Sequence, residues 1–160
     1  MVCLGNICRS PLAEGVLKEM AKTAGLDWEI DSAGTNGYHI GEAPHKLSQK
    51  VARLHGIDIA RQRARLFLAE DFSRFDFIYA MASDIIGEMR RIAGSKFNSE
   101  KVGLLMNAVY PGKNLDIPDP WSGPESGYRH VYTMIAQACE ALVREFVKGN
   151  PAQENIKISD

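Results

Sequence analysis

The sequence predicts an α/β fold in which a parallel central sheet of about four strands carries helices on both faces. Short apolar or alternating runs typical of strands occur at 27–34, 75–82 and 101–109. Between and after these runs, apolar residues recur at helical spacing. Strands that alternate with helices build parallel sheets, and ligands bind at the carboxyl ends of such strands.

Four stretches predict the helices. Apolar residues recur every three or four positions within 12–21, 47–54, 85–92 and 131–146. The first three stretches are followed by Gly25, Gly56 and Gly94, and glycine commonly follows the last turn of a helix. Ser10 and Pro11 suit the N-cap and the first helical position, so we expect the first helix to begin just after Arg9.

Length and charge limit the classes of protein to which the chain can belong. Of its 160 residues 45% are hydrophobic, and the formal net charge is -1. We expect residues 1–150 to form one domain and residues 151–160 to form a flexible tail. Without a basic run or an apolar segment near the ~20 residues of a membrane span, we expect no nucleic-acid or membrane partner and a cytoplasmic location.

The three cysteines indicate free thiols. Cys3, Cys8 and Cys139 are too few for a disulfide scaffold and too scattered for a zinc site. We therefore expect reduced thiols, no metal and no cofactor, which leaves a thiol available for chemistry.

The segment CLGNICRSP, residues 3–11, stands between the expected first strand and the first helix. A tight loop at a helix N-terminus directs backbone N–H groups into one concavity, which suits a phosphate group. Arg9 would hold two phosphoryl oxygens with its planar guanidinium. Cys3, in the same positive field, would stand as a thiolate nucleophile. The segment therefore predicts a phosphocysteine intermediate.

Other residues of this segment fit the same prediction. Gly5 permits a tight loop, and Asn6 and Ser10 supply side-chain hydrogen bonds. Only Met1 and Val2 stand before the cysteine, so either the sequence given starts late or the first strand is short, and a short central strand would cost sheet hydrogen bonds and core burial.

A general acid is needed to protonate the leaving oxygen. Asp119 lies between Pro118 and Pro120, which stiffen the loop and leave the carboxyl group little local backbone N–H to bind. Taken alone, an aspartate in such a loop is also a common turn former. Beside a bound dianion and a thiolate, the carboxyl group would take up a proton, donate it, and then accept one from the attacking water.

The pairing of CLGNICRSP with DPW, at 119–121, resembles the low-molecular-weight protein tyrosine phosphatases. The segments DSAGT (31–35), HGIDI (55–59) and FDFIYAM (75–81) stand in the order and spacing of that family. The resemblance implies Cys3 as nucleophile, Arg9 as phosphate binder and Asp119 as general acid and base.

Further roles follow only from this resemblance. It implies a phosphate-binding loop with Ser32 as its outer support and two aromatic walls for a phenyl ring. It also implies that Cys8 can form a protective disulfide with the nucleophile. The implied substrate-binding residues are Leu4, Gly5, Asn6, Ile7, Cys8, Ser10, Tyr38 and Trp121.

The apolar Ile7 favours phosphotyrosine, because similar phosphoarginine phosphatases carry threonine at this position. The expected partners are therefore a phosphotyrosine-containing protein as substrate and inorganic phosphate as product. The resemblance is compatible with a monomer or a weak homodimer.

Two alternatives stay open at this point. An arsenate reductase would use the same loop, but it needs two further cysteines and only Cys139 is available. A phosphate-binding module with weakened catalysis is the second alternative, since neutral Ala82 and Gln62 stand where the family usually has an aspartate and a histidine.

Overall fold

The chain folds around a four-stranded parallel sheet. The computed structural model describes residues 1–149, and in this part the strand order is β2-β1-β3-β4. The strands are β1 (Val2–Cys3), β2 (Ala33–Gly34), β3 (Ile78–Ala80) and β4 (Val102–Leu104). All neighbouring strands are parallel, with the registers Val2↔Ala33, Val2↔Ala80 and Ile78↔Val102. The predicted α/β fold is confirmed.

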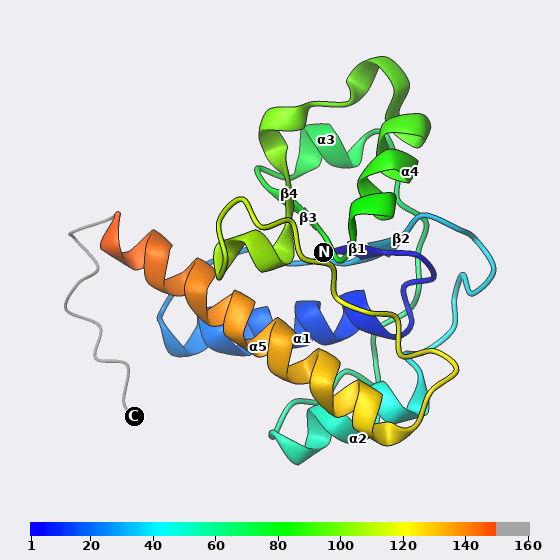
Figure 1. Cartoon of the computed structure of the whole chain (residues 1–160), viewed down its shortest axis with the longest axis vertical. Helices are drawn as coiled ribbons and strands as arrows, with labels where there is room; N and C mark the ends of the chain where they lie inside the picture. Colours follow the sequence, from blue (N-terminus) through cyan, green and yellow to red (C-terminus); the bar gives the residue numbers. More distant parts are fainter. Residues whose placement is uncertain (150–160) are drawn as a thin grey trace.

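Helices cover both faces of the sheet (Figure 1). One face carries α1 (Arg9–Thr23), α2 (Lys46–Leu54) and α5 (Glu125–Lys148), and the other carries α3 (Asp71–Arg74) and α4 (Ser83–Ala93). Three 3-10 helices are η1 (Gly94–Lys96), η2 (Ser99–Lys101) and η3 (Leu105–Ala108). The helix ends predicted from glycines are confirmed, since Gly25 and Gly56 follow α1 and α2 with φ values of 69° and 75°.

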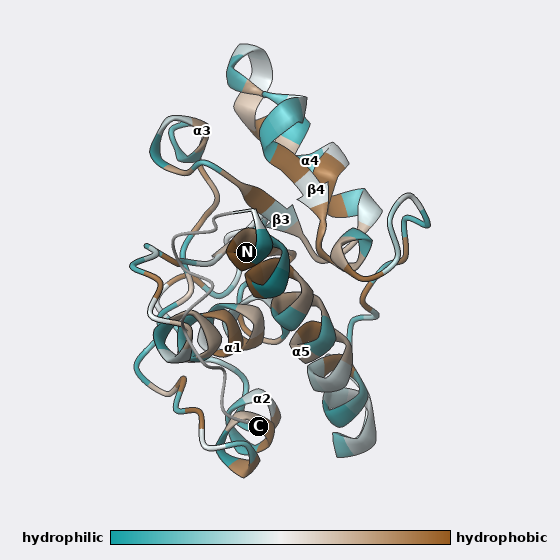
Figure 2. Ribbon diagram, turned by 90° about the vertical axis from the view of Figure 1, so that its left-hand side faces the viewer, coloured by the Kyte–Doolittle hydropathy of each residue, from teal (hydrophilic) through white to brown (hydrophobic). Residues whose placement is uncertain are grey.

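Two apolar cores lie between the sheet and its helices. Val2 belongs to the core on the α4 side, and Cys3, the next residue, belongs to the core on the α1 and α5 side. Successive side chains of a strand point to opposite faces, so a sheet covered on both faces needs apolar residues throughout. Figure 2 shows the matching apolar stripe of α4 beside β3 and β4.

The strands are shorter than the sequence predicted. Of the expected strand at 27–34 only Ala33–Gly34 pairs, because β1 extends over two residues and offers no partner to 27–31. The run at 75–82 pairs at Ile78–Ala80, and the run at 101–109 leaves the sheet after Leu104 to form η3. The apolar runs therefore located each strand but overestimated its length.

The start of α1 also differs from the prediction. The helix begins at Arg9 with Cys8 at the N-cap position, and the N-cap side chain makes no capping hydrogen bond. The Ser10 hydroxyl does not cap the helix because it is engaged by Cys3 and Asn6.

Within residues 1–149, no helix is both long and apolar enough to span a bilayer. The expected flexible tail, residues 151–160, lies outside the described residues.

Candidate active site

The loop from Leu4 to Cys8 joins the end of β1 to the start of α1. Asn6 has a φ of 55°, in the left-handed region that asparagine tolerates better than most residues. Its amide nitrogen donates to Ser10 Oγ at 2.8 Å and to Ser32 Oγ at 2.9 Å, and its Oδ1 accepts from the Arg65 N–H at 3.0 Å. This one side chain therefore fixes the turn of the loop from three directions.

Cys3 lies at the base of the loop, where β1 ends. Its Sγ is 3.0 Å from Ser10 Oγ, within hydrogen-bonding distance for a thiol or thiolate. The Ser10 hydroxyl in turn accepts from Asn6. A hydroxyl at this position can donate to a thiolate and stabilise its charge.

The loop leaves its backbone donors available. In the described part of the chain, the N–H groups from Leu4 to Arg9 have no backbone acceptor. Adjacent N–H groups at the N-terminus of a 15-residue helix, together with the helix dipole, attract an anion. The loop therefore has the donors that a phosphoryl group needs.

Arg9 is buried and directed at the loop that carries the candidate acid. Its Nη1 donates to the Ile117 carbonyl at 2.9 Å, and its Nη2 lies 3.4 Å from Asp119 Oδ2. Because the first of these bonds anchors one end of the guanidinium, the other N–H groups remain directed toward the site.

The Asp119 carboxyl group is less isolated than predicted. Its Oδ1 accepts from the Trp121 N–H at 3.1 Å. The expectation that the flanking prolines leave it little backbone N–H to bind was wrong, because Trp121, two residues on, closes an Asx turn across Pro120. This turn holds the carboxyl group at the tip of its loop.

A second set of residues supports the loop from outside. Ser32, which supports Asn6, donates to the carboxylate of the buried Glu14. A Cβ at Gly34 would lie 2.8 Å from the Leu4 carbonyl oxygen, so only glycine allows β2 to approach the loop this closely. On the other side, the His45 N–H donates to the Ile7 carbonyl at 2.8 Å.

The two aromatic side chains that the resemblance implies as walls are exposed. Tyr38 is 85% exposed and Trp121 is 50% exposed. The His39 ring packs against Trp121 with a centroid distance of 5.3 Å and contacts Glu42 through Nδ1 at 2.9 Å. Leu4 is also exposed.

Ile7 and Cys8, by contrast, are buried in the core, so their backbone rather than their side chains faces the loop interior. Burial raises the pKa of the Cys8 thiol to about 11. Cys8 Sγ lies 3.6 Å from the Tyr128 hydroxyl, which also donates to the Trp121 carbonyl at 3.4 Å. Tyr128 thus links the phosphate loop to the loop of Asp119.

The structure brings Cys3 and Arg9 of the opening motif to the same loop as the distant Asp119. A family model described as "Low molecular weight phosphotyrosine protein phosphatase" matches residues 1–152. The chain belongs to this family.

Relatives of this phosphatase family cover nearly the whole chain. The Bacillus subtilis low molecular weight protein-tyrosine-phosphatase YfkJ is 38% identical, over 92% of this chain and 94% of its own. Its crystal structure gives a TM-score of 0.83 over 93% of both chains. The human low molecular weight phosphotyrosine protein phosphatase is 34% identical, over 90% and 92%. A solved Drosophila arginine phosphatase is 31% identical with a TM-score of 0.82, over 91% and 94%.

Within the described residues of this family member, no cluster of three or more histidine, cysteine or acidic side chains could hold a metal ion. All three cysteines are free thiols. Gln62, at the position where the family usually has a histidine, donates to the Pro11 carbonyl at 3.1 Å.

Sequence reasoning missed several residues that hold the site. His45, to which no role was assigned, caps α2 and stacks on Tyr128 at 5.1 Å. Ile117 contributes only its backbone carbonyl oxygen, a group that every residue has, so its residue type does not indicate this role. The proximity of Arg65 to Asn6 also has no sequence signal, because 59 residues separate them.

Proposed function

We propose that the chain hydrolyses protein phosphotyrosine by double displacement through a phosphocysteine on Cys3. One observation carries this proposal: the Cys3–Ser10 pair and the Arg9–Asp119 pair converge on a single loop whose N–H groups remain available. This arrangement supplies a nucleophile, an anion cradle and an acid together.

In the first step, Cys3 Sγ attacks phosphorus, the S–P bond forms and the P–O bond to the tyrosine oxygen breaks. Arg9 and the loop N–H groups bind the nonbridging oxygens. Because these donors are already in place, they stabilise the negative charge of the oxygens in the transition state. Asp119, as the carboxylic acid, gives its proton to the leaving phenolate oxygen. Before this step the ion pair with Arg9 breaks, because the phosphoryl group takes the place of the Asp119 carboxylate beside the guanidinium, and Asp119 takes up the proton that it later donates from solvent.

In the second step, a water oxygen bonds to phosphorus and the S–P bond breaks. Asp119, now the carboxylate, accepts a proton from this water, which returns the acid to its starting form. The Ser10 hydroxyl donates to the departing thiolate. Inorganic phosphate is the product, and none of these steps uses a metal or a cofactor.

Phosphotyrosine suits the outer end of the site. Tyr38 and Trp121 each offer an exposed aromatic face on which a phenyl ring can stack. Phosphoarginine is the second candidate, favoured by the likeness to the Drosophila arginine phosphatase. The first candidate is favoured by the resemblance, because similar phosphoarginine phosphatases carry threonine at the position of Ile7, although the Ile7 side chain itself lies in the core.

The arsenate reductase alternative is less well supported. A relay would need a third accessible thiol, and Cys139 is fully buried in the core. Burial also raises the pKa of Cys139 to about 12, so its thiol stays protonated at neutral pH.

The test is hydrolysis of p-nitrophenyl phosphate in EDTA by the unmodified chain, Cys3→Ser and Asp119→Ala. We expect turnover by the unmodified chain, none by Cys3→Ser, and a loss by Asp119→Ala that is larger for phenyl phosphate than for p-nitrophenyl phosphate. Activity of Cys3→Ser would contradict the proposal. An unmodified chain that binds vanadate without turnover would instead be a phosphate-binding module, and thiol-dependent arsenate turnover would indicate the reductase.

A further inference from the structure

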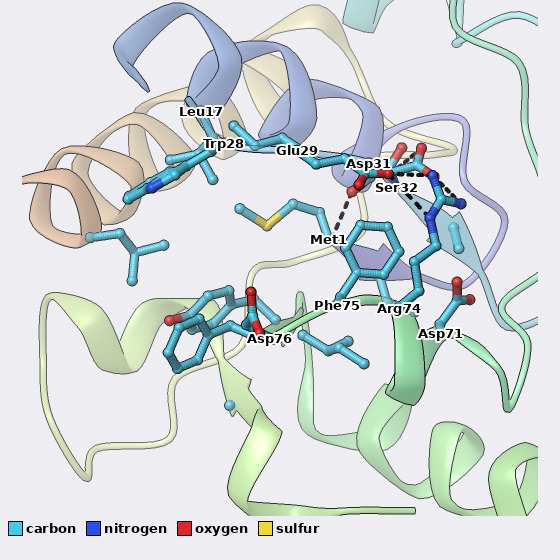
Figure 3. A pocket seen from close by; sticks show the side chains of 18 of the residues that line it. Met1, Leu17, Trp28, Glu29, Asp31, Ser32, Asp71, Arg74, Phe75 and Asp76 are labelled. Atoms are coloured by element: carbon cyan, nitrogen blue, oxygen red, sulfur yellow. Dashed lines mark hydrogen bonds and ion pairs between the residues drawn. The ribbon is translucent and has the colours of Figure 1, made fainter. Parts of the chain in front are cut away.

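The loop of Asp119, residues 109–124, joins η3 to α5 at the carboxyl ends of the strands (Figure 1). Over this range the structure has neither a helix nor a strand, so contacts with neighbouring elements set the position of Asp119. At the amino ends of the strands, by contrast, a cavity of ≈ 800 Å³ lies beside Met1, Trp28 and Phe75 (Figure 3), and residues 113–119 do not line it. The contacts that hold Asp119 are therefore found at the carboxyl ends.

Helix α4 begins at these carboxyl ends without a cap of its own. Its N-cap residue is Ala82, which has no side-chain acceptor. The first N–H groups of a helix have no partner within the helix, and the N-cap side chain usually accepts a hydrogen bond from one of them. The start of α4 is therefore open to an acceptor from elsewhere in the chain.

That acceptor is Asp116, which lies 33 positions after Ser83, the first residue of α4. Its Oδ1 accepts from the Ser83 N–H at 2.8 Å, and its Oδ2 accepts from the Ser83 hydroxyl at 3.2 Å. Two hydrogen bonds to one residue fix the orientation of the carboxylate, and a negative charge is favourable at a helix N-terminus. One side chain thus ties the loop of Asp119 to α4.

Asp116 also lies directly before the residue that orients Arg9. The Ile117 N–H donates to the Met81 carbonyl at 2.8 Å, and the Ile117 carbonyl accepts from Arg9 Nη1 at 2.9 Å. Asp119 follows across Pro118, whose ring fixes its own φ. Three residues of chain span at most about 10 Å, so a shift at Asp116 is transmitted to the Asp119 carboxyl group with little freedom to absorb it.

The loop of Asp119 is held from both sides. Before Asp119, the nearest polar side-chain contact within the described residues is that of Asp116, and the next is between Asn114 and Asn107. After Asp119, the Tyr128 hydroxyl on α5 donates to the Trp121 carbonyl. The loop is therefore fixed by α4 through Asp116 and by α5 through Tyr128.

We propose that Asp116 is a positioning residue for the general acid. By capping α4 it holds the loop so that the Asp119 carboxyl group reaches the leaving oxygen and the Ile117 carbonyl orients Arg9. Asp116 acts through these residues rather than on the substrate, since its two carboxylate oxygens are bound to Ser83. This inference rests on the proposed function, because the acid needs a leaving oxygen to protonate.

The test compares Asp116→Ala and Asp116→Asn with the matched control Asp84→Ala. The Asp84 carboxylate also lies in the first turn of α4 and accepts from the Ile85 N–H at 2.9 Å, but within the described residues it makes no hydrogen bond to the loop of Asp119. We expect both alanine variants to lower the melting temperature by a similar amount, about 3 °C. Only the loss of Asp116 should then affect the reaction.

The kinetic readout is kcat/KM for a poor and a good leaving group. In Asp116→Ala we expect kcat/KM to fall about 10-fold for phenyl phosphate and about 2-fold for p-nitrophenyl phosphate, because a displaced acid matters more for the poorer leaving group. Asp84→Ala should keep both values. Asp116→Asn should also keep both within about 2-fold, since an amide can accept from the Ser83 N–H and donate to the Ser83 hydroxyl.

A double variant shows whether Asp116 acts through Asp119. When Asp116→Ala is added to Asp119→Ala, the ratio of the two kcat/KM values should not change further, because the positioned acid is already gone. Amide exchange at Ile117, measured without substrate, should be faster in Asp116→Ala than in Asp84→Ala.

Several results would overturn the role of Asp116 alone. They are an active Asp116→Ala with an unchanged ratio, an equal change of the ratio in Asp84→Ala, and Asp116→Asn behaving as Asp116→Ala, which would make charge rather than position the cause. A further change of the ratio in the double variant would also count against it. An unmodified chain without turnover would instead overturn the proposed function, and the catalytic role of Asp116 with it.

Discussion

The guanidinium of Arg9 lies 3.4 Å from the carboxylate of Asp119, although 110 residues separate the two in the chain. The candidate phosphate binder and the candidate acid are therefore mutual partners before any substrate enters. A bound phosphoryl dianion competes with Asp119 for the same N–H groups. Binding of the substrate and release of the Asp119 carboxyl group from Arg9 are therefore coupled through this one contact.

Replacing Arg9 with lysine separates charge from geometry. Arg9→Lys keeps the positive charge but loses the planar fork and the hydrogen bond to the Ile117 carbonyl. We expect kcat/KM for p-nitrophenyl phosphate to fall about 100-fold or more. Arg53→Lys, on an exposed part of α2, should keep full activity. Arg9→Lys with unchanged kcat/KM would show that the fork is not used.

Two glycine substitutions test the contact between β2 and the phosphate loop. In Gly34→Ala the new Cβ would lie 2.8 Å from the Leu4 carbonyl oxygen and 3.0 Å from the Asn6 nitrogen, and because both of these are backbone atoms the loop must shift. We expect a loss of about 2 kcal/mol or more in unfolding free energy, together with most of the activity. Gly87→Ala, on α4 with open space around it, should stabilise by about 0.5–1 kcal/mol. Urea unfolding measures both, and equal effects would contradict the close approach.

Tyr128→Phe removes the hydroxyl that joins the two loops of the site. The Trp121 carbonyl and the Cys8 thiol lose their partner, so we expect a loss of about 1 kcal/mol in stability. Because the loop of Asp119 is then held less firmly, kcat should fall more for phenyl phosphate than for p-nitrophenyl phosphate.

Tyr132→Phe on the same helix is the matched control. Within the described residues the Tyr132 hydroxyl has no hydrogen bond, although its ring stacks on His55 at 3.9 Å. Equal kinetics for the two phenylalanine variants would argue against a link through Tyr128.

The thiol of Cys8 should be unreactive at neutral pH. Burial raises its pKa to about 11, and below that pH the thiol form dominates. In Cys3→Ser, alkylation of Cys8 by iodoacetamide at pH 7 should be about 100-fold slower than for an unperturbed thiol, and it should rise tenfold per pH unit toward pH 11. Mass spectrometry of the Cys8 peptide measures this. Rapid alkylation at pH 7 would contradict the prediction.

The sequence predicted the order of the elements well, because helical periodicity and glycine stops are local signals. It overestimated strand length, because pairing depends on a partner. Residues 27–34 alternate as a strand does, yet β1 reaches only far enough to pair with Ala33–Gly34. The missing hydrogen-bond partner, rather than β-propensity, ends that strand.

The sequence predicted those residues of the candidate site whose side-chain chemistry is specific to their residue type. Cys3, Arg9 and Asp119 each have a side chain that their proposed role requires. Supporting contacts were missed where the backbone makes them, as at Ile117, or where the partner is distant in sequence, as with Arg65 and Asn6. The N-cap prediction for Ser10 was wrong because its hydroxyl serves Cys3 instead.

Rapid-quench trapping on the Asp119→Ala variant tests the central proposal most directly. Loss of the base should slow breakdown of the intermediate, so acid quenching of a reaction with p-nitrophenyl phosphate should yield a peptide that carries one phosphoryl group on Cys3. The phosphopeptide should form as fast as the first equivalent of p-nitrophenol is released and be absent from Cys3→Ser. Release of p-nitrophenol at the same rate with Cys3 unmodified throughout would contradict the phosphocysteine mechanism.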